Sequence, residues 1–112
     1  DLVLSISTLE HIGFDDDAME GSGEKILAAI NACRKLLEPG GLFAFTVPLG
    51  YNPDLDQLIA DKALGADREW FMQRNGPREW REVPREKATG VAYGRPYPYA
   101  NALLIAEYDG AN

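Results

Sequence analysis

The chain has 112 residues, enough for one small domain, and its apolar (46%) and charged (26%) fractions are those of an ordinary globular protein. Its formal net charge of −7 argues against a nucleic-acid groove, because neutralising phosphates requires clustered Lys and Arg. Cys33 is the single cysteine, which excludes an internal disulfide and a cysteine-based metal cluster. No segment approaches the roughly 20 apolar residues of a membrane span. We therefore expect a cytoplasmic protein with no metal site and no nucleic-acid or membrane partner.

The first half of the chain alternates between strand-like and helix-like segments. Residues 2–7 are short, apolar and partly β-branched, which predicts a buried strand. A loop follows, and residues 24–37 are predicted to form a helix that ends before Pro39 and two glycines. Residues 42–47 predict a second buried strand. The apolar stripe of the helix, which recurs at helical spacing, consists of Ile26, Ile30, Cys33 and Leu37.

In the second half, Asn52 before Pro53 predicts the N-cap of a helix that runs to Leu64. Residues 70–74 and 79–83 predict two strands, with Asn75-Gly76 as the turn of a hairpin. The inward positions of the helix are predicted to be Leu55, Leu58, Ile59 and Ala63. The remaining segments are predicted to be a short helical turn, a loop and a last strand: residues 84–88, 90–99 and 102–108.

This order of elements predicts an α/β fold whose sheet begins with parallel strands and finishes with an antiparallel edge hairpin. We expect strands 2–7, 42–47 and 102–108 to share one sheet. The first two should be parallel, connected by the helix, and the last should be antiparallel to them.

Two segments of the chain resemble the class I S-adenosylmethionine-dependent methyltransferases. Residues 1–11 (DLVLSISTLEH) are similar to the family's fourth strand and its Leu-Glu-His turn, and residues 36–45 (LLEPGGLFAF) to the Leu-Leu-x-Pro-Gly-Gly entry into its fifth strand. The resemblance implies that residues 1–112 are a single partial domain, the C-terminal half of a Rossmann-like methyltransferase sheet. It implies methyl transfer from S-adenosylmethionine to an oxygen or nitrogen of a small molecule in the complete protein.

The family's glycine-rich cofactor loop has no counterpart in the sequence, since no Gly-x-Gly-x-Gly occurs. We therefore expect this chain alone to be inactive and to bind the cofactor weakly. By motif position, the resemblance assigns cofactor contacts to Ser7, Thr8 and Leu9. It also implies that Glu10 and His11 border the substrate pocket.

His11 is the only histidine, so imidazole general-base catalysis would have to use it. Glu10 and His11 are therefore the catalytic candidates. The alternative, which we weigh more heavily, is that both residues pin the turn by hydrogen bonds. Tyr51 lies beyond the end of the second strand and is a candidate substrate residue. Tyr93 and Arg95, in the loop before the last strand, are candidates of the same kind.

Other interpretations remain open at this point. The chain could be a non-catalytic fragment or assembly module that a partner copy completes, joined as a homo-oligomer through strand 2–7. A nicotinamide-dependent dehydrogenase half would share the sheet but does not account for both motif segments. The run Asp15-Asp16-Asp17 favours a solvated loop over a metal site, because consecutive carboxylates do not converge on one point.

Overall fold

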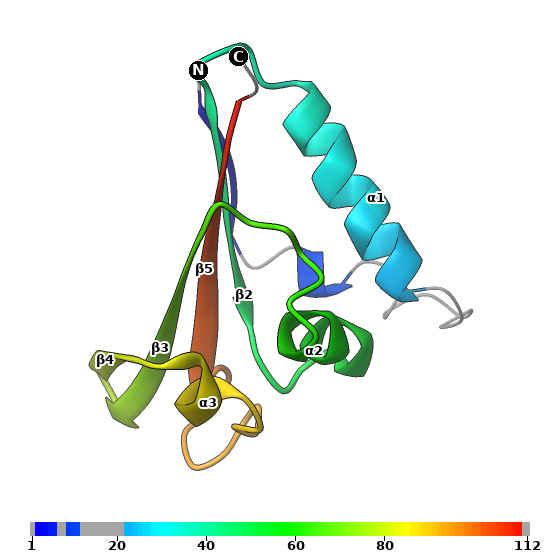
Figure 1. Cartoon of the computed structure of the whole chain (residues 1–112). Helices are drawn as coiled ribbons and strands as arrows, with labels where there is room; N and C mark the ends of the chain where they lie inside the picture. The colour runs from blue at the N-terminus through cyan, green and yellow to red at the C-terminus, as the bar shows by residue number, and fades with distance from the viewer. Residues whose placement is uncertain (1, 7–8, 12–21, 111–112) are drawn as a thin grey trace.

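A computed structural model describes residues 2–6, 9–11 and 22–110, which form a five-stranded mixed sheet with helices packed against it (Figure 1). In chain order the elements are β1 (Leu2–Ile6), η1 (Leu9–His11), α1 (Ser22–Lys35), β2 (Leu42–Pro48), α2 (Pro53–Ala60), β3 (Arg68–Gly76), β4 (Glu79–Val83), α3 (Arg85–Ala88) and β5 (Ala102–Asp109).

The strands are ordered β1-β2-β5-β3-β4 across the sheet. β1 and β2 are parallel, with Leu2 opposite Leu42, whereas β5 is antiparallel to both β2 and β3. β3 and β4 form an antiparallel hairpin that ends the sheet at one edge. The predicted α/β class, the parallel start and the edge hairpin are therefore confirmed. The last strand of the chain occupies the middle of the sheet, between β2 and β3.

The turn of the edge hairpin differs from the prediction. The strand β3 continues through Asn75 and Gly76, with a register shift between Arg74 and Gly76, and the chain turns at Pro77 and Arg78. The Arg74 guanidinium donates to the carbonyls of Gly76 (3.3 Å) and Pro77 (2.5 Å), which holds this irregular end in place. The Asn-Gly pair thus marks a bulge in the strand and not the turn.

The helix α1 begins at Ser22 and ends at Lys35, close to the predicted bounds. Ile26 and Ile30 are fully buried, while Cys33 packs at the margin of the core. The apolar stripe read from the sequence is therefore the face that α1 turns toward the sheet. None of the helices in the described part of the chain is long and apolar enough to cross a membrane.

The helix α2 is capped as predicted but is shorter. The Asn52 side-chain oxygen accepts hydrogen bonds from two backbone N–H groups in the first turn of the helix, those of Asp54 (3.0 Å) and Leu55 (3.3 Å). The helix ends at Ala60, because Lys62 adopts a left-handed conformation (φ 58°). Ala63 is consequently exposed, so its predicted inward position was wrong.

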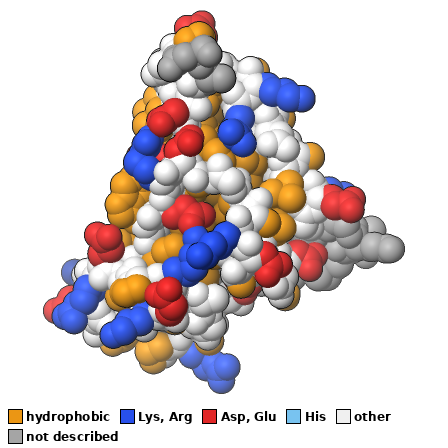
Figure 2. Space-filling view, in the orientation of Figure 1, with side chains coloured by type: hydrophobic (Ala, Val, Ile, Leu, Met, Phe, Trp, Pro, Cys, Tyr) orange, Lys and Arg blue, Asp and Glu red, His pale blue; other side chains and the backbone are white. Residues whose placement is uncertain are grey.

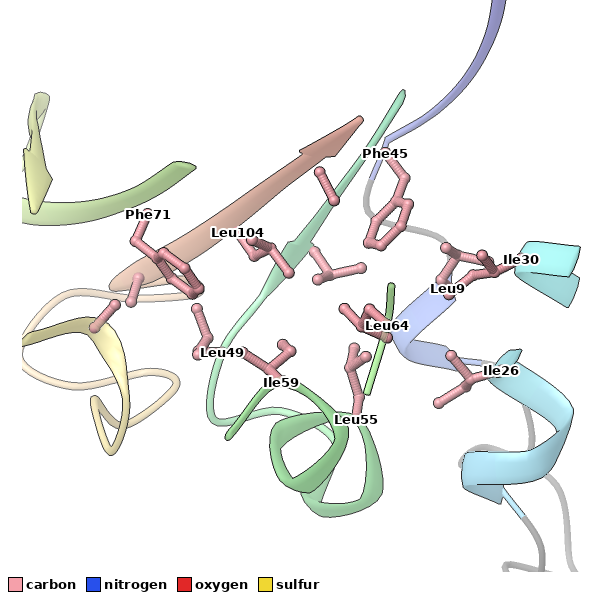
Figure 3. Close-up of a cluster of buried hydrophobic side chains, with 14 of the residues drawn as sticks. Leu9, Ile26, Ile30, Phe45, Leu49, Leu55, Ile59, Leu64, Phe71 and Leu104 are labelled. Atoms are coloured by element: carbon pink, nitrogen blue, oxygen red, sulfur yellow. The ribbon is translucent and has the colours of Figure 1, made fainter. Parts of the chain in front are cut away.

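One hydrophobic core lies between the helices and one face of the sheet (Figure 3). In this core the Tyr108 ring stacks against the rings of Phe43 and Phe45, with centroids 5.6 and 6.0 Å apart. The helices add buried side chains from α1, α2 and α3: Ile26, Ile30, Leu55, Ile59 and Ala88. Because strand side chains alternate between the two faces, this core uses every second residue of β2 and β5.

The opposite face of the sheet carries no described helix and is largely apolar, apart from the ion pairs of Arg68 with Glu107 and Asp109. Leu2, Leu4 and Ile6 of β1 are 62%, 57% and 63% exposed. Hydrophobic side chains show along this side of the molecule, at the left of Figure 2. The half-buried apolar residues that share the face are Leu42, Ala44, Trp70, Met72, Leu103 and Ile105.

Candidate functional site

Three segments meet at the edge of the sheet where the parallel strands β1 and β2 end. η1 follows β1, Tyr51 follows β2, and the loop that contains Tyr93 precedes β5. Because β5 runs antiparallel to β2, its first residues lie at the same edge, the lower end of the sheet in Figure 1. In open α/β sheets ligands bind in the crevice beyond the carboxyl ends of the strands, which makes this edge the candidate site.

The structure brings three of the predicted site residues together there. The Tyr51 hydroxyl and the His11 Nδ1 are 3.2 Å apart and share a hydrogen bond. Their rings meet edge to face, with centroids 5.0 Å apart and planes inclined by 70°. The Tyr93 ring meets Tyr51 in the same manner at 5.1 Å. Residues 11, 51 and 93, distant in sequence, thus form one row of rings, which we call the ring cluster.

Gly50 determines how closely the two tyrosine loops approach each other. Its φ is +85°, a conformation that favours glycine, and a Cβ atom there would lie 2.6 Å from both the Tyr93 nitrogen and the Val91 oxygen. No other residue fits without moving the backbone of the second loop. The ring contact between Tyr51 and Tyr93 therefore depends on the missing side chain at position 50.

Asp56 fastens the same loop to α2. Both of its carboxylate oxygens accept the Gly50 N–H, at 3.0 and 3.1 Å. Burial raises the pKa of the Asp56 carboxyl, and the hydrogen bond from Gly50 opposes this shift. Sequence reasoning missed Asp56, for which the only signal was an acidic residue in the first turn of a predicted helix.

The loop before β5 is fixed from within by Asn101, which is 1% exposed. Its side chain accepts from the Tyr97 N–H (3.1 Å) and donates to the carbonyls of Tyr97 (2.8 Å) and Tyr99 (3.1 Å). Arg74 of β3 donates to the Pro98 carbonyl at 2.8 Å, and its guanidinium lies 4.9 Å from the centre of the Tyr97 ring. The sequence analysis predicted neither anchor: Arg74 reaches the loop from 24 positions away in the chain, and Asn101 binds the backbone of residues two and four positions before it.

The other predicted site residues do not join the ring cluster in the described part of the chain. Leu9 is 5% exposed and its side chain belongs to the hydrophobic core, so only its backbone could face a ligand. Arg95 is exposed on the loop before β5. Ser7, Thr8 and the side chain of Glu10 lie outside the described residues.

A hollow of about 370 Å³ lies at the opposite edge of the sheet, where α1 and β5 end. Its lining residues are Asn31, Arg34, Lys35, Leu37 and Asp109. The cations there complement the C-terminal end of the helix dipole, which is a structural role. The hollow lies at the amino ends of the parallel strands, whereas ligands of open α/β sheets bind beyond the carboxyl ends. The ring cluster is therefore the better candidate.

Within residues 2–6, 9–11 and 22–110, no three side chains of His, Cys, Asp or Glu converge in a way that could hold a metal ion. Asp15, Asp16 and Asp17 lie outside these ranges. No protein-family model, curated protein or solved structure matches the chain. The assignment of the candidate site is therefore based on its geometry and on the two motif segments alone.

Proposed function

We propose that the chain belongs to an S-adenosylmethionine-dependent methyltransferase that acts on an oxygen or nitrogen of a small molecule, and that the ring cluster borders the methyl acceptor. The convergence of His11, Tyr51 and Tyr93 beyond the ends of two parallel strands is the observation that supports this function. The arrangement of the sheet adds support. β1 and β2 are parallel and β5 is antiparallel, as the resemblance to the family implies.

In this proposal His11 accepts the proton that the acceptor's hydroxyl or amine loses. Imidazole suits that role near neutral pH. The cofactor would supply an electrophilic methyl group. Tyr51 and Tyr93 would hold the acceptor beside His11, and orientation of the two reactants would provide much of the rate acceleration.

The described residues fit the acceptor side of such a site better than the cofactor side. Leu9 offers only its backbone, since its side chain is in the core. Ser7 and Thr8 lie outside the described residues, and the sequence holds no glycine-rich loop. The nucleotide part of the cofactor would therefore be held by residues beyond this sequence, in the complete protein.

The test uses the complete protein with isotopically labelled S-adenosylmethionine and a panel of small alcohols, phenols and amines. We expect transfer to at least one acceptor. His11→Ala should lower turnover roughly 100-fold or more while calorimetry gives an unchanged cofactor affinity. Tyr99→Phe is the matched control, because Tyr99 is 74% exposed and belongs to no ring contact of the site.

Failure of the complete protein to bind the cofactor would contradict the proposal. Equal losses of turnover and affinity that do not vary with pH would assign His11 a structural role.

A second candidate function is an assembly module that a partner copy completes. The exposed apolar residues of β1 and the apolar sheet face beside them favour it.

A further inference from the structure

The face of the sheet that lies opposite the hydrophobic core, which we call the uncovered face, takes no part in the proposed function. We propose that it packs against the same face of a second copy of the chain, so that two sheets close into a sandwich. The inference does not require methyl transfer. It gives the second candidate function, the assembly module, a defined interface.

The uncovered face is apolar across all five strands. Because side chains alternate along a strand, the strand registers place on it Leu2, Leu4, Ile6, Leu42, Ala44, Trp70, Met72, Trp80, Leu103 and Ile105. Trp80 lies on the edge strand β4, opposite Arg74, and is 37% exposed. Single exposed apolar side chains are ordinary on a protein surface, but a contiguous patch marks an interaction site.

The charged groups of the uncovered face compensate one another. Arg68 donates to Glu107 (2.8 Å) and to Asp109 (2.6 Å). The Arg74 guanidinium is bound to four backbone carbonyls. With Glu82, the described part of this face holds two cations and three carboxylates, whereas the whole chain carries a net charge of −7. Two copies therefore repel each other little when they approach through this face.

The size of the uncovered face matches what a specific dimer needs. Strands lie about 4.8 Å apart and rise about 3.3 Å per residue, so each side chain on one face covers roughly 30 Å². The five strands are 5 to 9 residues long, and together they span roughly 500 Å² before the relief of the side chains is counted. Two such faces bury about 1,000 Å² or more, the area at which specific protein–protein interfaces begin.

Face-to-face packing differs from pairing at the β1 edge. Edge pairing extends the sheet but leaves the uncovered face exposed in both copies. Packing of the two faces buries it, with the sheets about 10 Å apart, as in β-sandwiches. A two-fold axis brings the face against itself, so the contact closes at two copies.

The test measures the mass and the tryptophan emission of the full chain as it is diluted. Both tryptophans, Trp70 and Trp80, lie on the uncovered face. We therefore expect the emission to shift to longer wavelength over the concentration range in which sedimentation shows the dimer dissociating. Met72→Glu should raise the dissociation constant roughly 100-fold or more, because a two-fold contact buries the new carboxylate twice. Leu36→Glu is the matched control: this leucine follows α1, is 71% exposed, and should leave the constant unchanged.

A second substitution separates loss of the interface from loss of the fold. Trp80→Glu changes a residue that is already partly exposed on the edge strand, and it should raise the dissociation constant roughly tenfold or more. Circular dichroism and urea unfolding establish that each variant keeps the native fold.

A monomer at high concentration would overturn the inference. So would an assembly that keeps its mass in both face variants, or that dissociates without a change in tryptophan emission, because its contact would then be the β1 edge. None of these measurements involves cofactor or acceptor, so the failure of this inference and the failure of methyl transfer are observed separately.

Discussion

At the scale of single residues, Gly50 is required for two reasons: its backbone has a positive φ, and a Cβ atom there would clash with the Tyr93 loop. Gly50→Ala should therefore destabilise the protein by about 2 kcal/mol or more, the sum of left-handed strain and displacement of the Tyr93 loop. Gly40→Ala is the matched control, because its φ of +82° imposes the same strain while nothing lies within 4 Å of the added atom. Urea unfolding of the two variants measures the difference, and equal losses would show that the contact between the loops is not tight.

Tyr108 links stability to alkaline pH. It is fully buried, its hydroxyl donates to the Leu64 carbonyl at 2.7 Å, and burial raises its pKa to about 12, although the nearby Arg34 opposes the shift. The folded pKa lies above the ordinary value of 10.0, so the stabilising contribution is complete below pH 10 and is lost as pH rises toward about 12. Tyr108→Phe should cost about 1–2 kcal/mol at pH 7, where it leaves the Leu64 carbonyl without its donor.

The same variant should lose less stability than the unmodified protein between pH 10 and 12, since it lacks the buried phenol. Denaturant unfolding across that interval measures the two slopes. Tyr99→Phe, which removes an exposed phenol, should follow the unmodified protein. Equal slopes for Tyr108→Phe and the unmodified protein would contradict the role assigned to Tyr108.

At the scale of elements, Arg85 ties three of them together. From the start of α3 its guanidinium donates to the Ile59 carbonyl of α2 and to the Glu69 carboxylate of β3, and it lies 4.9 Å from the centre of the Phe71 ring. The Arg85 and Glu69 side chains are only 20% and 18% exposed, so removing one leaves the other poorly solvated. Arg85→Met should cost about 1–3 kcal/mol.

Arg78→Met provides the comparison, because Arg78 is exposed in the turn between β3 and β4. It should change the free energy of unfolding by less than about 0.5 kcal/mol. Thermal and urea unfolding measure the loss of stability in both variants. Losses of the same size would mean that Arg85 contributes no more to stability than an exposed surface charge.

At the scale of the whole molecule, β1 is an edge strand of the described sheet, rich in apolar residues and without Lys or Pro. Such an edge is a template for pairing with another chain. We expect the protein to self-associate through β1. Leu4→Lys should shift it toward the monomer in light scattering. Leu36→Lys should not, although this leucine, which directly follows α1, is even more exposed (71% against 57%). A stable monomer at high concentration, or equal effects of both substitutions, would contradict this expectation.

The sequence alone determined the local elements, because their signals lie within a few neighbouring residues. Helical spacing predicted α1 from Ile26 and Ile30, and Asn52 before Pro53 predicted the start of α2. It also singled out His11, Tyr51 and Tyr93, each from its place at the end of a strand or before one. It misplaced the hairpin turn and the end of α2, where a bulge and a left-handed residue overrode the local pattern.

Only the tertiary structure decided which of these elements and side chains meet. The insertion of β5 between β2 and β3 pairs it with β2, which lies more than 50 residues earlier in the chain, and no local preference specifies this pairing. The bond between His11 and Tyr51 spans 40 positions and the bond between Arg74 and Pro98 spans 24, so both exist only because packing brings these segments together. Periodicity and capping act over one or two turns of chain, whereas the geometry of the site depends on how the sheet closes and how tightly two loops fit at Gly50.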